Sequence, residues 1–149
     1  MQTSFTRSLL GSTAGYAALV LRLPIGLILV AHGGQKLFGW FGGYGLEGTG
    51  QWLASIGLAP GYVMALLAGS AEFFGGVALI LGLFTRPAAL VSAFTMLVAI
   101  FSVHVSNGLF LTNNGYEYAL ALFAATVALL IQGGGRLSLD QWLLQRFQR

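Results

Sequence analysis

The stretch from Gly61 to Phe84 constrains the fold of this chain more than any other. It is a long apolar run with a single carboxylate, Glu72, near its middle. About 20 mostly apolar residues span the hydrocarbon core of a bilayer as a helix. An acid at that depth is costly unless it is paired, hydrated or protonated. The run therefore predicts a transmembrane helix whose acid faces inward.

Small residues mark the face of this helix that carries the acid. They recur at helical spacing on the side of Glu72, so a second helix can approach closely there. The members of this stripe are Gly61, Ala65, Gly69 and Gly76.

Composition agrees with a membrane protein. The 149 residues are 56% hydrophobic and only 7% charged, whereas soluble domains are about a quarter charged. The formal charge of +3 comes from basic residues scattered at helix ends, which does not favour nucleic-acid binding. The absence of cysteine excludes disulfides and thiolate metal sites formed by the chain itself. A single membrane domain over residues 1–149 accounts for the whole chain.

We expect an all-α fold, a bundle of four antiparallel transmembrane helices. The short turn at Thr85-Arg86-Pro87 makes the second and third spans antiparallel neighbours. For the first run, a secretory signal peptide is the alternative, disfavoured because the run is long and contains Arg22. The predicted spans cover about residues 16–37, 61–84, 87–104 and 116–132.

The segments outside the spans suggest surface-lying elements. The connection over residues 38–60 is rich in glycine and aromatic residues, which settle at membrane–water boundaries. Within it we expect a short interfacial helix from Gln51 to Ile56. After the last span, Ser138 to Gln141 has the pattern of a helix capping box. An amphipathic C-terminal helix with Trp142, Phe147 and Arg149 is expected to follow.

The loop charges predict the orientation. Four spans place both termini on one side, which holds Arg7, Arg86, Arg136, Arg146 and Arg149. Lys36 and Glu47 fall on the other side. The positive-inside rule therefore predicts cytoplasmic termini for a multi-pass protein of the plasma membrane.

Polar side chains from all four spans are expected to meet in the outer half of the bundle, since such residues face the interior or a wet cavity. Together they would hold a small polar head group, pass a proton, or pin the helices together. Glu72 lies near mid-span and Arg22 in the inner half of the first span. The outer candidates are His32, Lys36, His104, Asn107 and Glu117.

Each candidate has a structural alternative. Arg22 either snorkels to the inner head groups or pairs with Glu72. Lys36 snorkels outward or contacts a ligand. The histidines hydrogen-bond between helices or join Glu117 in a metal site, although nothing in the spacing demands a metal. Glu117 caps its own helix or joins the cluster.

Several sequence segments together resemble the DoxX family of bacterial inner-membrane proteins. The likeness covers roughly residues 16–140 and rests on the order and spacing of short motifs. These are Arg22, His32-Gly-Gly-Gln-Lys-Leu37, Glu72-Phe-Phe-Gly-Gly76, Leu81-Gly-Leu-Phe-Thr-Arg86, His104, Asn107-Gly108, Gly115-Tyr-Glu117 and Gly133-Gly-Gly135.

The resemblance implies a four-helix protein of the bacterial inner membrane. It extends distantly to the DoxD subunit of a thiosulfate:quinone oxidoreductase and to a membrane component of an oxidative-stress complex. Carried over by position, the residues to test are Arg22, His32, Lys36, Glu72, His104 and Glu117.

No phosphate-binding loop, nucleophile–base set or haem-attachment motif is present. Redox chemistry would therefore use a bound quinone, a flavin or a partner protein. The favoured hypothesis is a redox-associated subunit that binds a quinone-like head group, with Glu72 as proton acceptor or donor and Lys36 or Arg22 setting its charge. The alternatives are a non-catalytic scaffold for an oxidoreductase or stress-response complex, and a small proton or solute carrier that must form a homo-oligomer.

Overall fold

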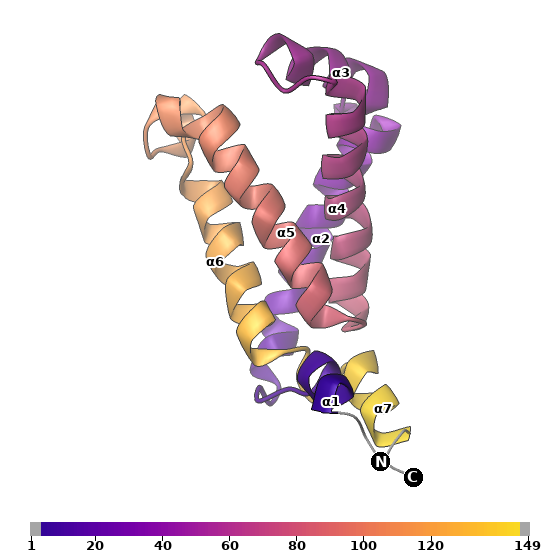
Figure 1. Cartoon of the computed structure of the whole chain (residues 1–149). Coiled ribbons are helices and arrows are strands. Elements are labelled where there is room, and N and C mark those ends of the chain that lie inside the picture. The colour runs from indigo at the N-terminus through magenta and orange to yellow at the C-terminus, as the bar shows by residue number, and fades with distance from the viewer. Residues whose placement is uncertain (1–3, 147–149) are drawn as a thin grey trace.

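The computed structural model describes residues 4–146, and every regular element in that range is a helix (Figure 1). The all-α fold expected from the sequence is confirmed. Phe147 and Arg149, which the sequence assigns to the amphipathic tail, lie outside the described range. The α-helices are α1 (Ser4–Leu10), α2 (Ala17–Phe38), α3 (Gly45–Ser55), α4 (Gly61–Leu81), α5 (Thr85–Ala99), α6 (Glu117–Gln132) and α7 (Leu139–Arg146).

Three of these helices are long and apolar enough to cross a membrane. They are Ala17–Phe38, Gly61–Leu81 and Thr85–Asn107. The third includes α5, a π-helical turn (Ile100–His104) and a 3-10 turn (Val105–Asn107). Helix α6 is apolar but has 16 residues, about 24 Å of helix against a hydrocarbon core of about 30 Å. The fourth span is therefore the shortest.

Helices α2 and α4 pack closely because glycines on both helices face each other. A Cβ at Gly26 would lie 2.7 Å from the Gly76 carbonyl oxygen, and one at Gly33 would lie 2.8 Å from that of Gly69. The stripe predicted on α4 is buried together with Glu72. Small residues allow two helix backbones this approach, and they fix the antiparallel register of α2 against α4.

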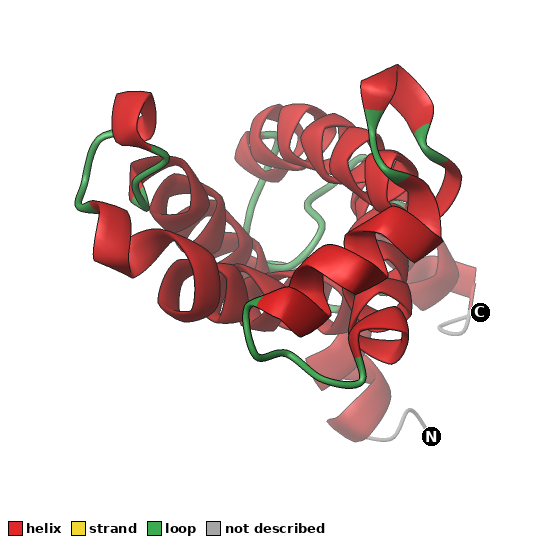
Figure 2. Cartoon of the chain, turned by 90° about the horizontal axis from the view of Figure 1, so that it is seen from above, coloured by secondary structure: helices red, strands yellow, loops and turns green. Residues whose placement is uncertain are grey.

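The two helix pairs, α2/α4 and α5/α6, separate toward one end of the molecule (Figure 1). We call this the outer end; it carries α3 and the loop between α5 and α6. Both described ends of the chain, with α1 and α7, lie at the opposite, inner end. Seen from above, the backbones of the long helices stand apart in two groups (Figure 2).

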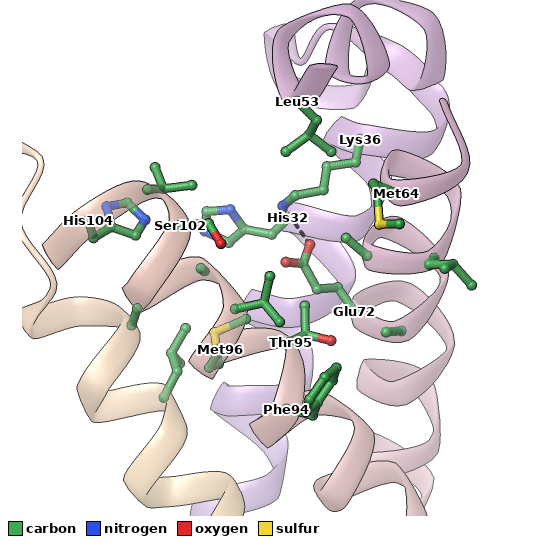
Figure 3. Close-up of a pocket in the computed structure, with 18 of the residues that line it drawn as sticks. His32, Lys36, Leu53, Met64, Glu72, Phe94, Thr95, Met96, Ser102 and His104 are labelled. Atoms are coloured by element: carbon green, nitrogen blue, oxygen red, sulfur yellow. Dashed lines mark hydrogen bonds and ion pairs between the residues drawn. The ribbon is translucent and has the colours of Figure 1, made fainter. Parts of the chain in front are cut away.

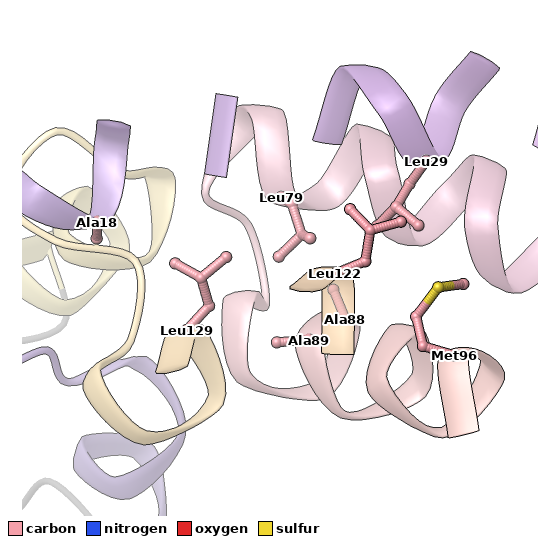
Figure 4. Close-up of a cluster of buried hydrophobic side chains, with 8 residues drawn as sticks. All are labelled: Ala18, Leu29, Leu79, Ala88, Ala89, Met96, Leu122 and Leu129. Atoms are coloured by element: carbon pink, nitrogen blue, oxygen red, sulfur yellow. The ribbon is translucent and has the colours of Figure 1, made fainter. Parts of the chain in front are cut away.

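A buried hydrophobic cluster joins the two pairs (Figure 4). It draws side chains from all four long helices, so it holds the pairs together where they converge. Its members are Ala18, Leu29, Leu79, Ala88, Ala89, Met96, Leu122 and Leu129.

The helix after the glycine-rich connection is longer than the sequence predicted. The expected helix began at Gln51, whereas α3 begins at Gly45. Glycine is a poor helix former, but Gly50 packs against the backbone of Tyr62 at the start of α4. Tertiary contact thus stabilises helix where propensity alone does not.

Candidate functional site

A cleft of about 590 Å³ lies between the two helix pairs, in their outer half. This volume falls within the range of small-molecule sites. The core cluster forms its floor, because Leu29, Met96 and Leu122 belong to both. Helix α3 contributes Trp52 and Leu53 to the outer boundary.

Two helices line the cleft with one continuous face each. Positions on α4 follow steps of three, one, three and one: Met64, Leu67, Ala68, Ala71 and Glu72. Val91, Phe94, Thr95, Val98, Ala99 and Ser102 on α5 and its extension continue this pattern, and Met96, Val103 and His104 also line the cleft. This is the spacing of one side of an α-helix, so each of the two helices turns a single face toward the cleft.

An ion pair joins α2 to α4 at the wall of the cleft (Figure 3). Lys36 Nζ lies 2.6 Å from Glu72 Oε2. The Glu72 side chain is 5% exposed and that of Lys36 is 27% exposed. Burial of a charge is unfavourable unless it is paired. The ammonium group of Lys36 therefore supplies the countercharge that stabilises the buried carboxylate of Glu72.

The register of the two helices explains why Lys36, and not Arg22, reaches Glu72. Since Gly26 faces Gly76 and Gly33 faces Gly69, Glu72 lies opposite a point between those two α2 glycines. Helical side chains lean toward the N-terminus of their own helix. In this antiparallel pair Glu72 leans outward and Lys36 leans inward, so they converge. Arg22 leans away from both.

Arg22 forms its hydrogen bonds at the inner end of the molecule. The expectation that it snorkels to the head groups or pairs with Glu72 is therefore wrong. It is 2% exposed. Its guanidinium donates to the carbonyl oxygens of Leu79, Ile80, Gly134 and Leu137. These carbonyls belong to the end of α4 and to the segment between α6 and α7. Arg22 does not line the cleft.

His32 projects from α2 into the cleft (Figure 3). Its ring centroid lies 6.1 Å from that of Tyr118 on α6, with the rings tilted by 47°. This contact spans the gap between the two helix pairs. It places a second pair of polar side chains in the cleft beside Lys36 and Glu72.

His104 ends the π-helical turn of the third span and also lines the cleft. Its Nδ1 lies 2.9 Å from the carbonyl oxygen of Asn114. A carbonyl only accepts, so Nδ1 carries the hydrogen; in the neutral ring this leaves Nε2 as an acceptor. Turns of π-helix are rare and occur frequently at functional sites.

Asn107 and Glu117 organise the loop between α5 and α6 and do not line the cleft. Asn107 Nδ2 donates to the carbonyl oxygens of Val103 and Asn114, at 3.1 and 3.3 Å. Glu117 Oε1 accepts from the backbone N–H of Leu111 at 2.6 Å. Their contacts fix the loop that positions His104.

Four polar residues of the cleft were not singled out from the sequence: Thr95, Ser102, Asn114 and Tyr118. Thr95 and Ser102 are two helical turns apart on the α5 face, and this spacing could have identified them. Asn114 lies in a loop where asparagine is an ordinary turn residue, so no sequence signal distinguishes it from the other loop residues. Within residues 4–146 no group of three or more His, Asp or Glu side chains is placed to hold a metal ion.

Comparison with known proteins identifies relatives over most of the chain. A provisionally assigned oxidoreductase, CatD, of Bacillus subtilis is 34% identical over 127 residues, 85% of this chain and 87% of the relative. The Escherichia coli inner membrane protein YqjF is 30% identical over 135 residues, 87% of this chain and 93% of the relative.

A second Escherichia coli inner membrane protein, YphA, is 28% identical over 136 residues, 88% of this chain and 93% of the relative. No solved structure matches the chain. The sequence pattern of the DoxX family matches residues 17–105, which carry Arg22, His32, Lys36, Glu72 and His104. The chain therefore belongs to the DoxX family of membrane proteins.

Proposed function

We propose that this protein is a redox-associated membrane subunit whose cleft binds the head group of a quinone. The observation that carries the proposal is the Lys36–Glu72 ion pair at 2.6 Å in the wall of an otherwise mostly apolar cleft. An apolar pocket with a few convergent polar groups is the usual form of a small-molecule site. The name of the Bacillus subtilis relative, which assigns it provisionally as an oxidoreductase, agrees with this class of function.

The chemistry of the cleft residues suits a flat ring with oxygen atoms. Reduction of a quinone to a quinol takes up two electrons and two protons. Lys36 and Tyr118 donate hydrogen bonds to a carbonyl oxygen, and the free Nε2 of a neutral His104 accepts one from a hydroxyl. Glu72 is the proton donor or acceptor. The electrons come from an oxidoreductase partner, since the chain has no cysteine pair of its own.

We also propose that the inner end faces the cytoplasm of a bacterial plasma membrane. Arg7, Arg86, Arg136 and Arg146 belong to elements at that end, whereas Lys36 and Glu47 lie toward the other. Basic residues are enriched in short cytoplasmic loops. Two of the relatives are inner membrane proteins by name.

The binding test uses purified protein in lipid nanodiscs with a ubiquinone or menaquinone analogue. Glu72→Gln keeps the size of the side chain but removes its charge, and it is expected to weaken binding at least tenfold. Glu47→Gln removes a carboxylate on α3 that does not line the cleft, and it serves as the matched control. Equal affinity of both variants and the parent protein would remove the proposal. Co-purification with an oxidoreductase in that case would favour a scaffold.

A further inference from the structure

Among residues 4–146, no element covers the side of the cleft between α4 and α5. The turn Gly82–Phe84 holds these helices together at the inner end, and they separate toward the outer end (Figure 1). Facing glycines pack α2 closely against α4, and the rings of His32 and Tyr118 meet between α2 and α6. Helix α5 packs along α6.

Apolar side chains form the rim of this opening. Leu67 on α4 is 60% exposed and Phe94 on α5 is 65% exposed, and both line the cleft. Val91 and Val98 extend the same rim along α5 and are also exposed. These side chains point to the part of the bundle surface that a bilayer would cover.

The cleft is polar at its α2/α4 wall and at its outer end, where Ser102, His104 and Asn114 lie, and it is mainly apolar between α4 and α5. The charged pair of Lys36 and Glu72 lies on the wall between α2 and α4, and His32 projects beside it (Figure 3). At the side between α4 and α5 the lining is mainly hydrocarbon, from Leu67 and Phe94, with Thr95 beside Phe94 (Figure 3). A site with polar groups inside and hydrocarbon at its mouth matches an amphiphile whose head is bound and whose tail stays in an apolar solvent.

We propose that the ligand of this cleft carries a long apolar tail, that the tail leaves the protein between α4 and α5, and that the ligand enters sideways from the bilayer. This inference rests on the proposed function and specifies its ligand as a lipid-soluble, tail-bearing quinone. The tail lies between Leu67 and Phe94 and continues among the acyl chains. Its apolar surface is never transferred to water, so entry costs little desolvation.

The experiment locates the tail directly. A quinone analogue with a photoreactive diazirine at the first carbons of its tail is bound to the protein in nanodiscs and irradiated, and the adducts are mapped by peptide mass spectrometry. The expected adducts lie on the α4 and α5 rim, at or beside Leu67 and Phe94. Adducts on α3 or the 105–116 loop instead, with the head group still bound, would overturn the sideways route and leave the proposed function intact.

A kinetic experiment tests the route with a matched control. The chain has no native cysteine, so Leu67→Cys and Phe74→Cys each give one labelling site on α4. Leu67 is 60% exposed at the cleft, and Phe74 is 62% exposed but does not line it. A bulky maleimide on Leu67→Cys is expected to slow association of the tail-bearing quinone at least tenfold relative to the same unlabelled variant. On Phe74→Cys it is expected to have no effect.

Two results would contradict the inference in different ways. Equal rates with and without the label at Leu67→Cys would overturn entry between α4 and α5. No binding of either the tail-bearing quinone or a water-soluble, tail-less analogue to the unlabelled parent protein would overturn the proposed function and this inference with it. Binding of the tail-bearing form that is slowed only by the label at the rim supports both.

Discussion

Lys36 and Glu72 meet across the interface of α2 and α4, with Nζ and Oε2 2.6 Å apart, and their exposures differ. The Glu72 side chain is almost fully buried, whereas 27% of the Lys36 side chain is exposed. The two partners are therefore unequal. Removing Lys36 leaves a buried carboxylate without its countercharge, and removing Glu72 leaves an amine that water or a ligand can reach.

This asymmetry gives the first prediction. Lys36→Met is expected to lower the free energy of unfolding by about 3 to 5 kcal/mol, the usual effect of leaving a buried charge unpaired. Glu72→Gln is expected to lower it less, since its amide oxygen still accepts from Lys36. The double variant Lys36→Met/Glu72→Leu is expected to recover most of the loss. Unfolding in mixed micelles measures all three, and equal losses for the two single variants would refute the asymmetry.

The glycines between α2 and α4 give a second prediction. A Cβ at Gly76 would lie 2.6 Å from the Gly26 carbonyl oxygen and 2.8 Å from the Val30 nitrogen, both backbone atoms. Gly76→Ala must therefore move α2, and a loss of about 2 kcal/mol or more in unfolding free energy is expected, as for overpacking.

The neighbouring position is the control for this substitution. A Cβ at Gly75 would meet only the Ser92 hydroxyl at close range, 2.8 Å away, and that group can rotate. Alanine is also the better helix former by about 1 kcal/mol, so Gly75→Ala is expected to be neutral or nearly so. Thermal unfolding in detergent compares the two, and similar losses would show that α2 and α4 do not depend on this close approach.

The sequence predicted this interface well, for a physical reason. Glycine and alanine at steps of four and seven define one face of a helix whatever its partner is. The stripe on α4 is buried as expected, and Arg22, Gly26, Leu29 and Gly33, which share one face of α2, are buried with it. The partner of Glu72 depended on the register between the helices, and a single sequence does not contain it.

The fourth span was predicted less well. In the sequence, Ala121, Ala124 and Ala128 form a stripe of small residues on the side of Glu117. The buried face instead carries Ala119, Leu122, Thr126 and Leu129. A helix that is apolar on every side can place any face against lipid, so its composition does not select the buried one. For the same reason Tyr118 was not recognised as a cleft residue.

Arg22 provides a third prediction. Its guanidinium donates to four carbonyl groups at the inner end, and lysine cannot reproduce this planar set of donors. Arg22→Lys is expected to lower the melting temperature clearly, whereas Arg136→Lys, at an exposed side chain, is expected to leave it unchanged. Below the melting temperature Arg22→Lys is expected to bind the quinone analogue like the parent protein. If Arg22→Lys loses quinone binding but keeps its stability, Arg22 belongs to the binding site after all.

Asp140 on α7 gives a fourth prediction. Its two carboxylate oxygens accept from the backbone N–H groups of Phe84 and Thr85, at 2.6 and 2.8 Å, where α5 begins. Asp140→Asn turns one acceptor into a donor that faces an N–H group. A loss of about 1 to 3 kcal/mol is expected for the unpaired group. The measurement is the rate of proteolysis in the 133–138 segment, which is expected to rise. An unchanged rate would show that the Asp140 carboxylate is not needed to hold α7 in place.

The orientation gives the last prediction, and the cysteine-free chain makes it simple to test. Thr112 lies in the outer loop and Gln145 in α7 at the inner end, and both are exposed. In intact spheroplasts, a membrane-impermeant maleimide is expected to label Thr112→Cys and to leave Gln145→Cys unlabelled until the membrane is opened. The physical cause is the excess of arginine at the inner end, which favours retention in the cytoplasm. The reverse labelling pattern would show that the protein has the opposite orientation in the membrane. The cleft would then lie in the cytoplasmic half of the bilayer.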